Sequence, residues 1–167
     1  MSALPRFGQA LRPMTQHDVD SVLEIERAAY EFPWSHGNFI DSLHAGHPAA
    51  WLQGDAGQMR GYFVAMHGVE EIHLLNLTVA PKAQGLGHGR QLLQTVVDIG
   101  RQHGAHQVWL EVRRHNERAQ RFYARFGFAG SGVRKAYYPA ARGQREDAIV
   151  MRLGIDSTPG RRADALD

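Results

Sequence analysis

The most constraining feature of the sequence is a glycine-rich junction between a strand-like run and a long helical pattern. The apolar run Ile72–Val79 is ended by Pro81, and the cluster QGLGHG follows at residues 84–89. Apolar residues then recur at helical spacing over Arg90–His103, and Gly104 closes the pattern. Unpaired backbone N–H groups at such a helix start bind anions, and glycines let a phosphate approach the backbone. The junction therefore predicts an α/β fold with a phosphate-binding loop.

Three kinds of phosphate-binding loop compete for this cluster. A Walker loop ends in Gly-Lys-Ser/Thr, which the cluster lacks. A dinucleotide fingerprint, Gly-x-Gly-x-x-Gly, fails from either possible start, because its third glycine falls on Arg90 or on Leu92. The pattern that remains is Gln-x-x-Gly-x-Gly, at Gln84, Gly87 and Gly89. Taken alone, this pattern is equally compatible with a helix start that binds no ligand.

The other patterns predict one mixed α/β domain, which suits a chain of 167 residues. Hydrophobic spacing, caps and turn residues give the order α-α-β-β-β-α-β-α-β-β, over residues 15–30, 37–43, 50–52, 61–67, 72–79, 90–103, 108–112, 116–126, 128–134 and 148–153. We expect an N-terminal extension (1–10), the domain itself (11–155) and a disordered tail (156–167), whose turn-forming residues have no apolar period.

Composition excludes several classes of protein. No apolar run reaches the roughly 18 residues that cross a bilayer, and the N-terminal residues lack the apolar segment of a secretory signal. The absence of cysteine excludes a disulfide scaffold, a thiolate zinc site and a cysteine nucleophile. We therefore expect a cytoplasmic protein that makes no contact with a membrane.

Charge is distributed unevenly along the chain. Residues 1–83 carry 5 basic and 9 acidic side chains, whereas residues 84–167 carry 14 basic and 8 acidic ones. This asymmetry predicts an anionic ligand near the C-terminal half and permits a cationic partner near the N-terminal half. Nucleic-acid binders usually show a denser basic stripe interleaved with aromatic residues. We therefore expect no direct nucleic-acid partner, and a monomer or weak oligomer.

Two residues in the C-terminal half carry possible acid–base chemistry. Glu111 interrupts the apolar strand VWLEV, where an ionised carboxylate must be paired or reach water. Either it forms a salt bridge with Arg113 or Arg114, or it is a general base. Tyr123 lies on the helix that Asn116 starts, where it is either a core aromatic or a phenol that protonates a departing thiolate. Neither residue decides between these interpretations alone.

Together, these pieces resemble the GNAT acyltransferases over residues 11–153. Within that family, the chain is most similar to the branch that acetylates the N-terminal alanine of a small-subunit ribosomal protein. The resemblance is carried by segments along most of the chain: Pro33–Ser35, Asn76–Val79, Gln84–Arg90, Leu110–Arg113, Asn116, Tyr123, Tyr137–Pro139 and Arg145–Ala148. No motif position departs from the pattern, although residues 49–60 and the tail match nothing specific.

The resemblance implies a fold, a cofactor and roles for individual residues. The fold is a mostly antiparallel sheet with a splayed strand pair flanked by helices, and acetyl-CoA is the acetyl donor, with no metal. Glu111 becomes the general base and Tyr123 the general acid of direct transfer, while backbone N–H groups near Leu77 polarise the thioester carbonyl. The implied coenzyme A contacts are Leu77, Thr78, Val79, Gly85, Leu86, Gly87, His88, Gly89, Arg90 and Asn116.

The expected substrate is the N-terminal amine of a ribosomal protein. An α-amine has a pKa near 7.7–8.0 and lysine one near 10.4, so deprotonating lysine at pH 7 costs roughly 3–4 kcal/mol more. Two aromatic, loop-like segments, Phe32–Ser35 and Tyr137–Pro139, are expected at the peptide entrance, with Trp34 and Tyr138 binding substrate.

Two alternatives stay open for the function. One is a GNAT enzyme that acetylates a small-molecule amine, which has less need of aromatic loops. The other is a non-catalytic acetyl-CoA-binding module, which has no need of both Glu111 and Tyr123. The ten histidines include the close pairs His44/His47 and His103/His106, but no third ligand lies at metal spacing. We therefore interpret the histidines as surface residues and expect no metal site.

Overall fold

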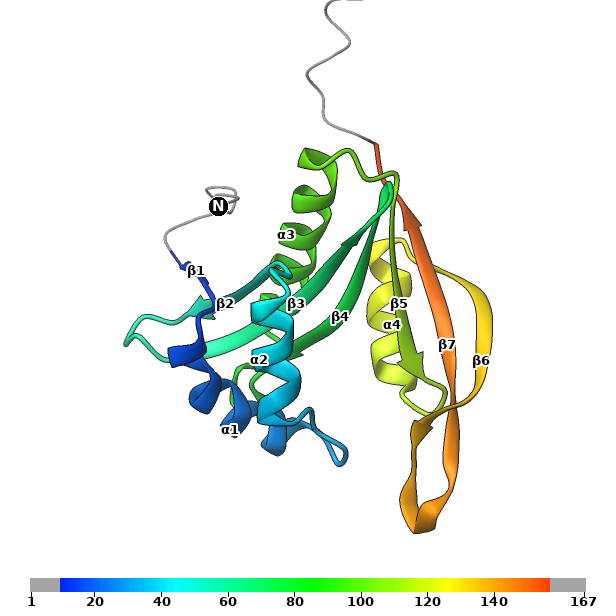
Figure 1. Ribbon diagram of the computed structural model, residues 1–167, viewed down its shortest axis with the longest axis horizontal. Coiled ribbons are helices and arrows are strands. Elements are labelled where there is room, and N and C mark those ends of the chain that lie inside the picture. The colour runs from blue at the N-terminus through cyan, green and yellow to red at the C-terminus, as the bar shows by residue number, and fades with distance from the viewer. Residues whose placement is uncertain (1–9, 157–167) are drawn as a thin grey trace, which may run out of the picture.

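A seven-stranded mixed sheet runs through the computed structural model, which describes residues 10–156 (Figure 1). The strand order is β1-β2-β3-β4-β5-β7-β6, and only β4 and β5 are parallel neighbours. The strands are β1 (Leu11–Pro13), β2 (Ala49–Gln53), β3 (Met59–Gly68), β4 (Glu71–Val79), β5 (Gln107–Arg113), β6 (Ala129–Pro139) and β7 (Arg145–Gly154). The predicted fold class, a mostly antiparallel sheet flanked by helices, is confirmed.

Four α-helices are present, and each begins within four residues of its predicted start. They are α1 (Val19–Ala29), α2 (His36–His44), α3 (His88–Gln102) and α4 (Glu117–Phe126). Thr15 and Asp18 form a capping box at a 3₁₀ turn (Gln16–Asp18) that leads into α1. Ser35 accepts a hydrogen bond from the Asn38 backbone at the start of α2. Asn116 caps α4 in the same way through the Ala119 amide.

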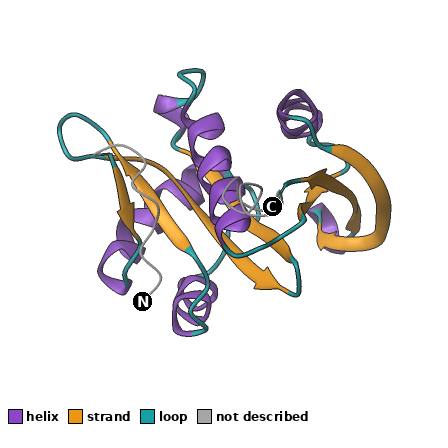
Figure 2. Cartoon of the chain, turned by 90° about the horizontal axis from the view of Figure 1, so that it is seen from above, coloured by secondary structure: helices purple, strands orange, loops and turns teal. Residues whose placement is uncertain are grey.

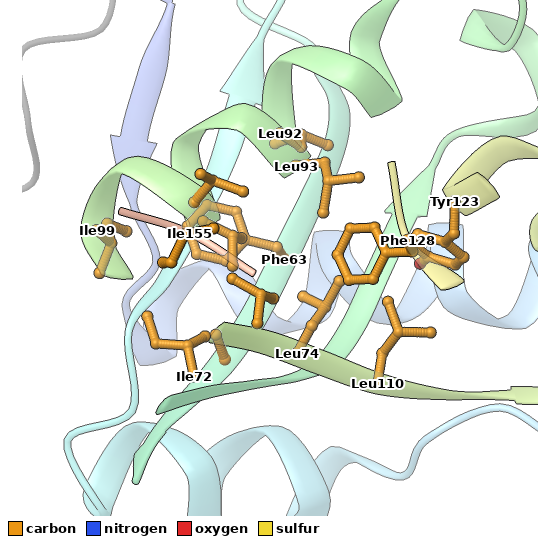
Figure 3. Close-up of a cluster of buried hydrophobic side chains, with 14 of the residues drawn as sticks. Phe63, Ile72, Leu74, Leu92, Leu93, Ile99, Leu110, Tyr123, Phe128 and Ile155 are labelled. Carbon is orange, nitrogen blue, oxygen red and sulfur yellow. The ribbon is translucent and has the colours of Figure 1, made fainter. Parts of the chain in front are cut away.

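Helices cover both faces of the sheet, so the protein has two hydrophobic cores (Figure 2). The larger core packs α3 and α4 against the strands, with Leu92, Leu93 and Phe63 fully buried. Tyr123 and Phe128 lie together at one end of this cluster (Figure 3). The smaller core packs α1 and α2 against the other face of β2, β3 and β4.

The two parallel strands separate soon after they begin. β4 pairs with β5 only over Glu71–His73 and Gln107–Trp109, and beyond these residues the strands diverge (Figure 1). A bulge in β4 interrupts its register with β3, because Val64 pairs with Asn76 while Ala65 pairs with Leu74. The predicted splayed strand pair is therefore present, and it opens the sheet at its centre.

The structure differs from the expected elements in two places. β1, a three-residue strand paired with β2, was not predicted, because so short a segment carries no period. The segment Tyr137–Pro139, expected as a loop, forms the end of β6 and pairs with β7. Its strand pattern is hidden by a register shift between Arg134 and Tyr138, where Ala136 has a φ of 51°. The expected extension (1–10) and tail (156–167) lie outside the described residues, except for Ala10 and Asp156.

Candidate active site

A cavity of about 380 Å³ lies where β4 and β5 diverge. Its walls come from α1 and the segment after it, from β4 and β5, from the start of α4 and from the end of β6. The cavity brings together six predicted site residues from distant parts of the chain: Trp34, Leu77, Glu111, Asn116, Tyr123 and Tyr138. The two candidate acid–base residues thus share one cavity.

The Glu111 side chain is buried in this cavity wall, with only 6% of it exposed. Its Oε2 atom lies 2.6 Å from His73 Nε2. Its Oε1 atom is also buried and has no hydrogen-bond partner among residues 10–156, because Arg134 Nε is 3.6 Å away. One carboxylate oxygen is therefore held by a hydrogen bond, whereas the other has an ion pair with Arg134 but no hydrogen bond.

The suggested salt-bridge partners of Glu111, Arg113 and Arg114, are wrong, because Glu111 pairs with His73 and Arg134 instead. Arg113 pairs with Glu146 at 3.2 Å, and Arg114 pairs with Asp147 at 3.3 Å. Both acids belong to β7, which lies beside β5 and so brings its carboxylates to the end of that strand.

His73 was missed by sequence reasoning, because all histidines were interpreted as surface residues. Only 12% of its side chain is exposed, and its ring stacks on Trp109 with centroids 3.6 Å apart and planes 8° apart. A polar residue at the centre of the otherwise apolar run Ile72–Leu75 was the available signal. Its partner could not be identified without the β4–β5 register, in which His73 lies opposite Trp109.

Tyr123 lines the other side of the cavity from α4. Its ring makes edge contacts with Phe122 and Phe128, with centroids 5.1 Å and 5.6 Å away. The hydroxyl has no hydrogen-bond partner within the described part of the chain. Burial raises the pKa of the Tyr123 phenol well above its usual range. The phenol is therefore protonated at neutral pH and can donate its proton.

The glycine cluster forms the turn into α3, as predicted. Gly85 and Gly87 have φ angles of 80° and 85°, which L side chains rarely adopt. Gly87 is the N-cap of α3, and no side chain caps this helix. The first N–H groups of the helix have no partner within it, so an anion can accept hydrogen bonds from them.

The other predicted residues of this turn have different surroundings. Leu86 is 67% exposed, and the Arg90 guanidinium lies 5.6 Å from the Phe126 ring centroid. His88 Nε2 lies 3.2 Å from Arg60 Nη1. A side chain at Gly89 would meet Phe122 at 3.3 Å, so close packing between α3 and α4 also explains this glycine.

The predicted coenzyme A contacts on β4 are Leu77, Thr78 and Val79. This part of the strand has an unpaired backbone edge, but the Thr78 side chain already has hydrogen-bond partners. From Leu74 to Val79, the edge of β4 that faces β5 has no β5 partner. Thr78 is buried, and its hydroxyl binds Asn76 and Tyr30, so only its backbone is available to a ligand. The Asn116 side-chain oxygen is likewise used, as the cap of α4.

The cavity mouth is lined by aromatic side chains and one arginine. Trp34 packs on Phe39, with ring centroids 5.0 Å apart. The Arg113 guanidinium lies 5.0 Å from the Phe32 ring centroid and 4.5 Å from that of Tyr138. It also donates a hydrogen bond to the Pro139 carbonyl at 2.8 Å. Arg113 therefore links the two aromatic segments across the cavity.

A second buried carboxylate, Glu26 on α1, was also missed. It is 1% exposed and accepts hydrogen bonds from the Tyr62 hydroxyl and the Asn76 amide, each at 2.8 Å. Burial raises the pKa of Glu26, although these hydrogen bonds oppose the increase. The signal was its position, because Glu26 continues the apolar stripe of Val19, Val22 and Leu23 at helical spacing.

Residues 10–156 contain no group of three or more metal-ligating side chains that could hold a metal ion. Within the same residues, no helix has the length and apolar character needed to cross a membrane.

Comparison with known proteins identifies the relatives of this chain. The model of the acetyltransferase (GNAT) family matches residues 19–128. The ribosomal protein bS18-alanine N-acetyltransferase of Haemophilus ducreyi is 31% identical over 144 residues, which cover 86% of this chain and 98% of that protein. The protein of the same name from Salmonella typhimurium is 35% identical over 138 residues, covering 83% and 92%.

A solved structure agrees with these relatives. The crystal structure of the ribosomal-protein-S18-alanine N-acetyltransferase from Escherichia coli is similar with a TM-score of 0.80 and 32% identity. The similarity covers 90% of this chain and 96% of that one. The likeness therefore extends over nearly the whole of each protein.

Proposed function

Because this chain belongs to the acetyltransferase (GNAT) family, we propose that it acetylates the N-terminal alanine of ribosomal protein bS18, with acetyl-CoA as donor. Relatives that are 31% and 35% identical to this chain are named ribosomal protein bS18-alanine N-acetyltransferase, and the match covers more than nine-tenths of their length. The observation that carries the proposal is that one cavity is lined both by a carboxylate with an oxygen that makes no hydrogen bond within residues 10–156 and by a neutral phenol.

The residues around the cavity fit the expected donor, acetyl-CoA. The uncapped start of α3, with Gly85 and Gly87 in left-handed conformations, would hold the pyrophosphate through backbone N–H groups. The unpaired edge of β4 over Leu77–Val79 would hold the chain of the molecule that leads to its thioester. When bound, acetyl-CoA supplies the activated acetyl group.

Glu111 and Tyr123 divide the proton chemistry between them. Glu111 Oε1 accepts a proton from the substrate's α-ammonium group, which frees the nitrogen lone pair. The Tyr123 hydroxyl donates its proton to the departing sulfur, and the second proton lost by the attacking nitrogen restores the phenol. Backbone N–H groups of β4 near Leu77 polarise the carbonyl under attack. An α-amine, with a pKa near 7.7–8.0, needs less help from such a base than lysine does.

The peptide enters between the segments that Arg113 links. Trp34 and Tyr138 line this part of the cavity and offer rigid aromatic surfaces to a peptide. We place the protein in the cytoplasm as a monomer or weak oligomer, acting on the free protein N-terminus without binding nucleic acid.

The direct test is mass spectrometry of synthetic peptides incubated with the protein and acetyl-CoA. The peptides carry the N-terminal sequence of bS18 with alanine, serine, glycine or leucine in first place, and a fifth peptide has a blocked N-terminus and an internal lysine. We expect acetylation of the alanine peptide at its α-amine in preference to the others. Acetylation of polyamines or aminoglycosides, with none of the peptides modified, would identify a small-molecule enzyme instead.

A further inference from the structure

The two oxygens of Glu111 have different surroundings, although both belong to one buried carboxylate. Oε2 lies 2.6 Å from His73 Nε2, whereas Oε1 has no hydrogen-bond partner among residues 10–156. A carboxylate oxygen only accepts hydrogen bonds, so Nε2 carries the proton in this contact whenever Glu111 is ionised. A hydrogen bond of this length orients the carboxylate.

The position of His73 is fixed by the fold. Its ring stacks on Trp109, and two guanidinium groups, those of Arg134 and Arg152, lie 5.6 Å and 5.4 Å from the Trp109 ring. The histidine stands at the last paired position of β4 and β5, where His73 lies opposite Trp109. The contact with Glu111 is therefore made at the point from which the two strands diverge.

We propose that His73 is the positioning residue of the general base, holding Glu111 Oε2 so that Oε1 faces the substrate amine. The inference rests on the proposed function and adds a specific partner to its base. In the step itself, an N–H bond of the α-ammonium group breaks and an O–H bond forms at Oε1. The hydrogen bond from Nε2 to Oε2 stays in place, so the carboxylate keeps its orientation throughout.

Other ionisable groups near this pair come from β6 and β7. Arg134 lies 3.6 Å from Oε1, but 48% of its side chain is exposed, so solvent screens its charge. Tyr137 and Tyr138 on β6 also lie near Glu111, and Arg152 on β7 reaches only the Trp109 ring. In the described part of the chain, His73 is the one residue that hydrogen-bonds the Glu111 side chain.

The test compares two substitutions at residue 73 with a matched control. His73→Phe keeps a flat ring for Trp109 but removes the donor, whereas His73→Gln keeps an N–H donor. His67→Phe is the control, because His67 also contacts another ring, that of His103 with centroids 4.3 Å apart, but does not line the cavity. Each variant is assayed for kcat, for KM of acetyl-CoA and for kcat/KM against pH on the alanine peptide.

For His73→Phe we expect kcat to fall about ten- to hundredfold, less than the roughly 10²–10⁴-fold attributed to a catalytic base itself. The KM of acetyl-CoA stays unchanged. The profile of kcat/KM against pH differs from that of the wild type, because the base has lost the group that orients it. His73→Gln recovers most of the activity, and His67→Phe matches the wild type.

Failure of this inference is distinguishable from failure of the proposed function. If the wild-type protein leaves the alanine peptide unmodified, the proposed function is wrong, and the inference about His73 is wrong as well. If the wild type and the control are active and Glu111→Gln is inactive, an unchanged kcat and pH profile in His73→Phe overturns the inference alone. Should His73→Phe fail to fold, His73→Val, which suits a strand, carries the same expectations.

Discussion

Two buried glutamates line the same cavity, one from helix α1 and one from strand β5, and their surroundings differ in whether both carboxylate oxygens are hydrogen-bonded. Glu26, on α1, has both oxygens bound by neutral donors, Tyr62 and Asn76. Glu111, on β5, has one oxygen bound by His73, whereas the other makes no hydrogen bond within residues 10–156 and has only the ion pair with Arg134. Burial alone therefore does not identify a catalytic acid or base; the informative feature is an oxygen that the protein leaves unsatisfied.

The contrast follows from where each glutamate lies relative to the splayed strands. Glu26 faces the part of β4 after its bulge, where Asn76 is buried and binds both Glu26 and Thr78. This network of hydrogen bonds stabilises β4 on the side of the sheet where α1 packs. Glu111 lies where β5 separates from β4, so no β4 side chain beyond His73 reaches it. One carboxylate supports the wall of the site, and the other is placed to react.

Glu111→Gln should have the largest effect on turnover. The amide cannot accept a proton, so we expect kcat to fall toward the upper end of the roughly 10²–10⁴-fold range of acid–base catalysis, most severely below the pKa of the amine. Affinity for acetyl-CoA, measured by calorimetry, should stay near that of the wild type. A rate unchanged across pH would assign Glu111 to a purely structural pair with His73.

Tyr123→Phe should slow acetylation toward the lower end of the same range of about 10²–10⁴-fold. The phenyl ring keeps the contacts with Phe122 and Phe128, so folding and acetyl-CoA affinity should be preserved. The defect should shrink with an acyl donor whose thiol is more acidic, because that thiolate departs without a proton. An equal defect with both donors would mean that Tyr123 is a core aromatic residue and does not protonate the departing thiolate.

Gly87→Val should weaken acetyl-CoA binding by about 1–3 kcal/mol, the usual cost of losing buried polar contacts, without altering the proton chemistry at Glu111. The reason is its φ of 85°, which a β-branched residue adopts only with strain, so the N–H groups at the start of α3 move. Gly46→Val is the matched control, since Gly46 has a φ of 75°, equally open surroundings and no place in the cavity. Normal calorimetric binding by a folded Gly87→Val would contradict a phosphate-binding role for this loop.

Local signals predicted most of the fold and part of the site. The predicted caps Thr15 and Asn116 act over three residues, so these two helix starts follow from the sequence. Gly87 is equally local, because its left-handed conformation belongs to the turn itself. Glu111 and Tyr123 were singled out because each departs from its surroundings or fits a family pattern, and they do line one cavity.

What the sequence did not reveal depends on which strands meet. The contact between His73 and Glu111 joins residues 38 positions apart, and it exists only in one register of β4 and β5. Tyr138 was assigned to a loop, because the irregular pairing around Ala136 breaks the alternation of β6. Contacts across strands and irregular registers are properties of the folded sheet, so no local pattern encodes them.

Glu26→Gln should have the smallest effect on turnover, and its main consequence should be a change in how stability depends on pH. Burial raises the folded-state pKa of Glu26 above its ordinary 4.5, so its contribution to stability is fully present below pH 4.5 and is lost as the pH rises through the raised value. Glutamine does not titrate. The free energy of unfolding of Glu26→Gln, relative to the wild type, should therefore increase as the pH rises above 4.5, as measured by urea unfolding at several pH values.

Glu24→Gln is the matched control for this prediction. Glu24 is exposed on the same helix, so this substitution removes a charge that water already surrounds. The amide of Glu26→Gln can still accept a hydrogen bond from Asn76, so the wall of the cavity should hold and turnover should stay close to that of the wild type. A loss of turnover as steep as that of Glu111→Gln, in a variant that unfolds normally and binds acetyl-CoA, would mean that Glu26 takes part in the proton chemistry. The satisfied carboxylate would then be reactive, and hydrogen-bond satisfaction would not distinguish the two glutamates.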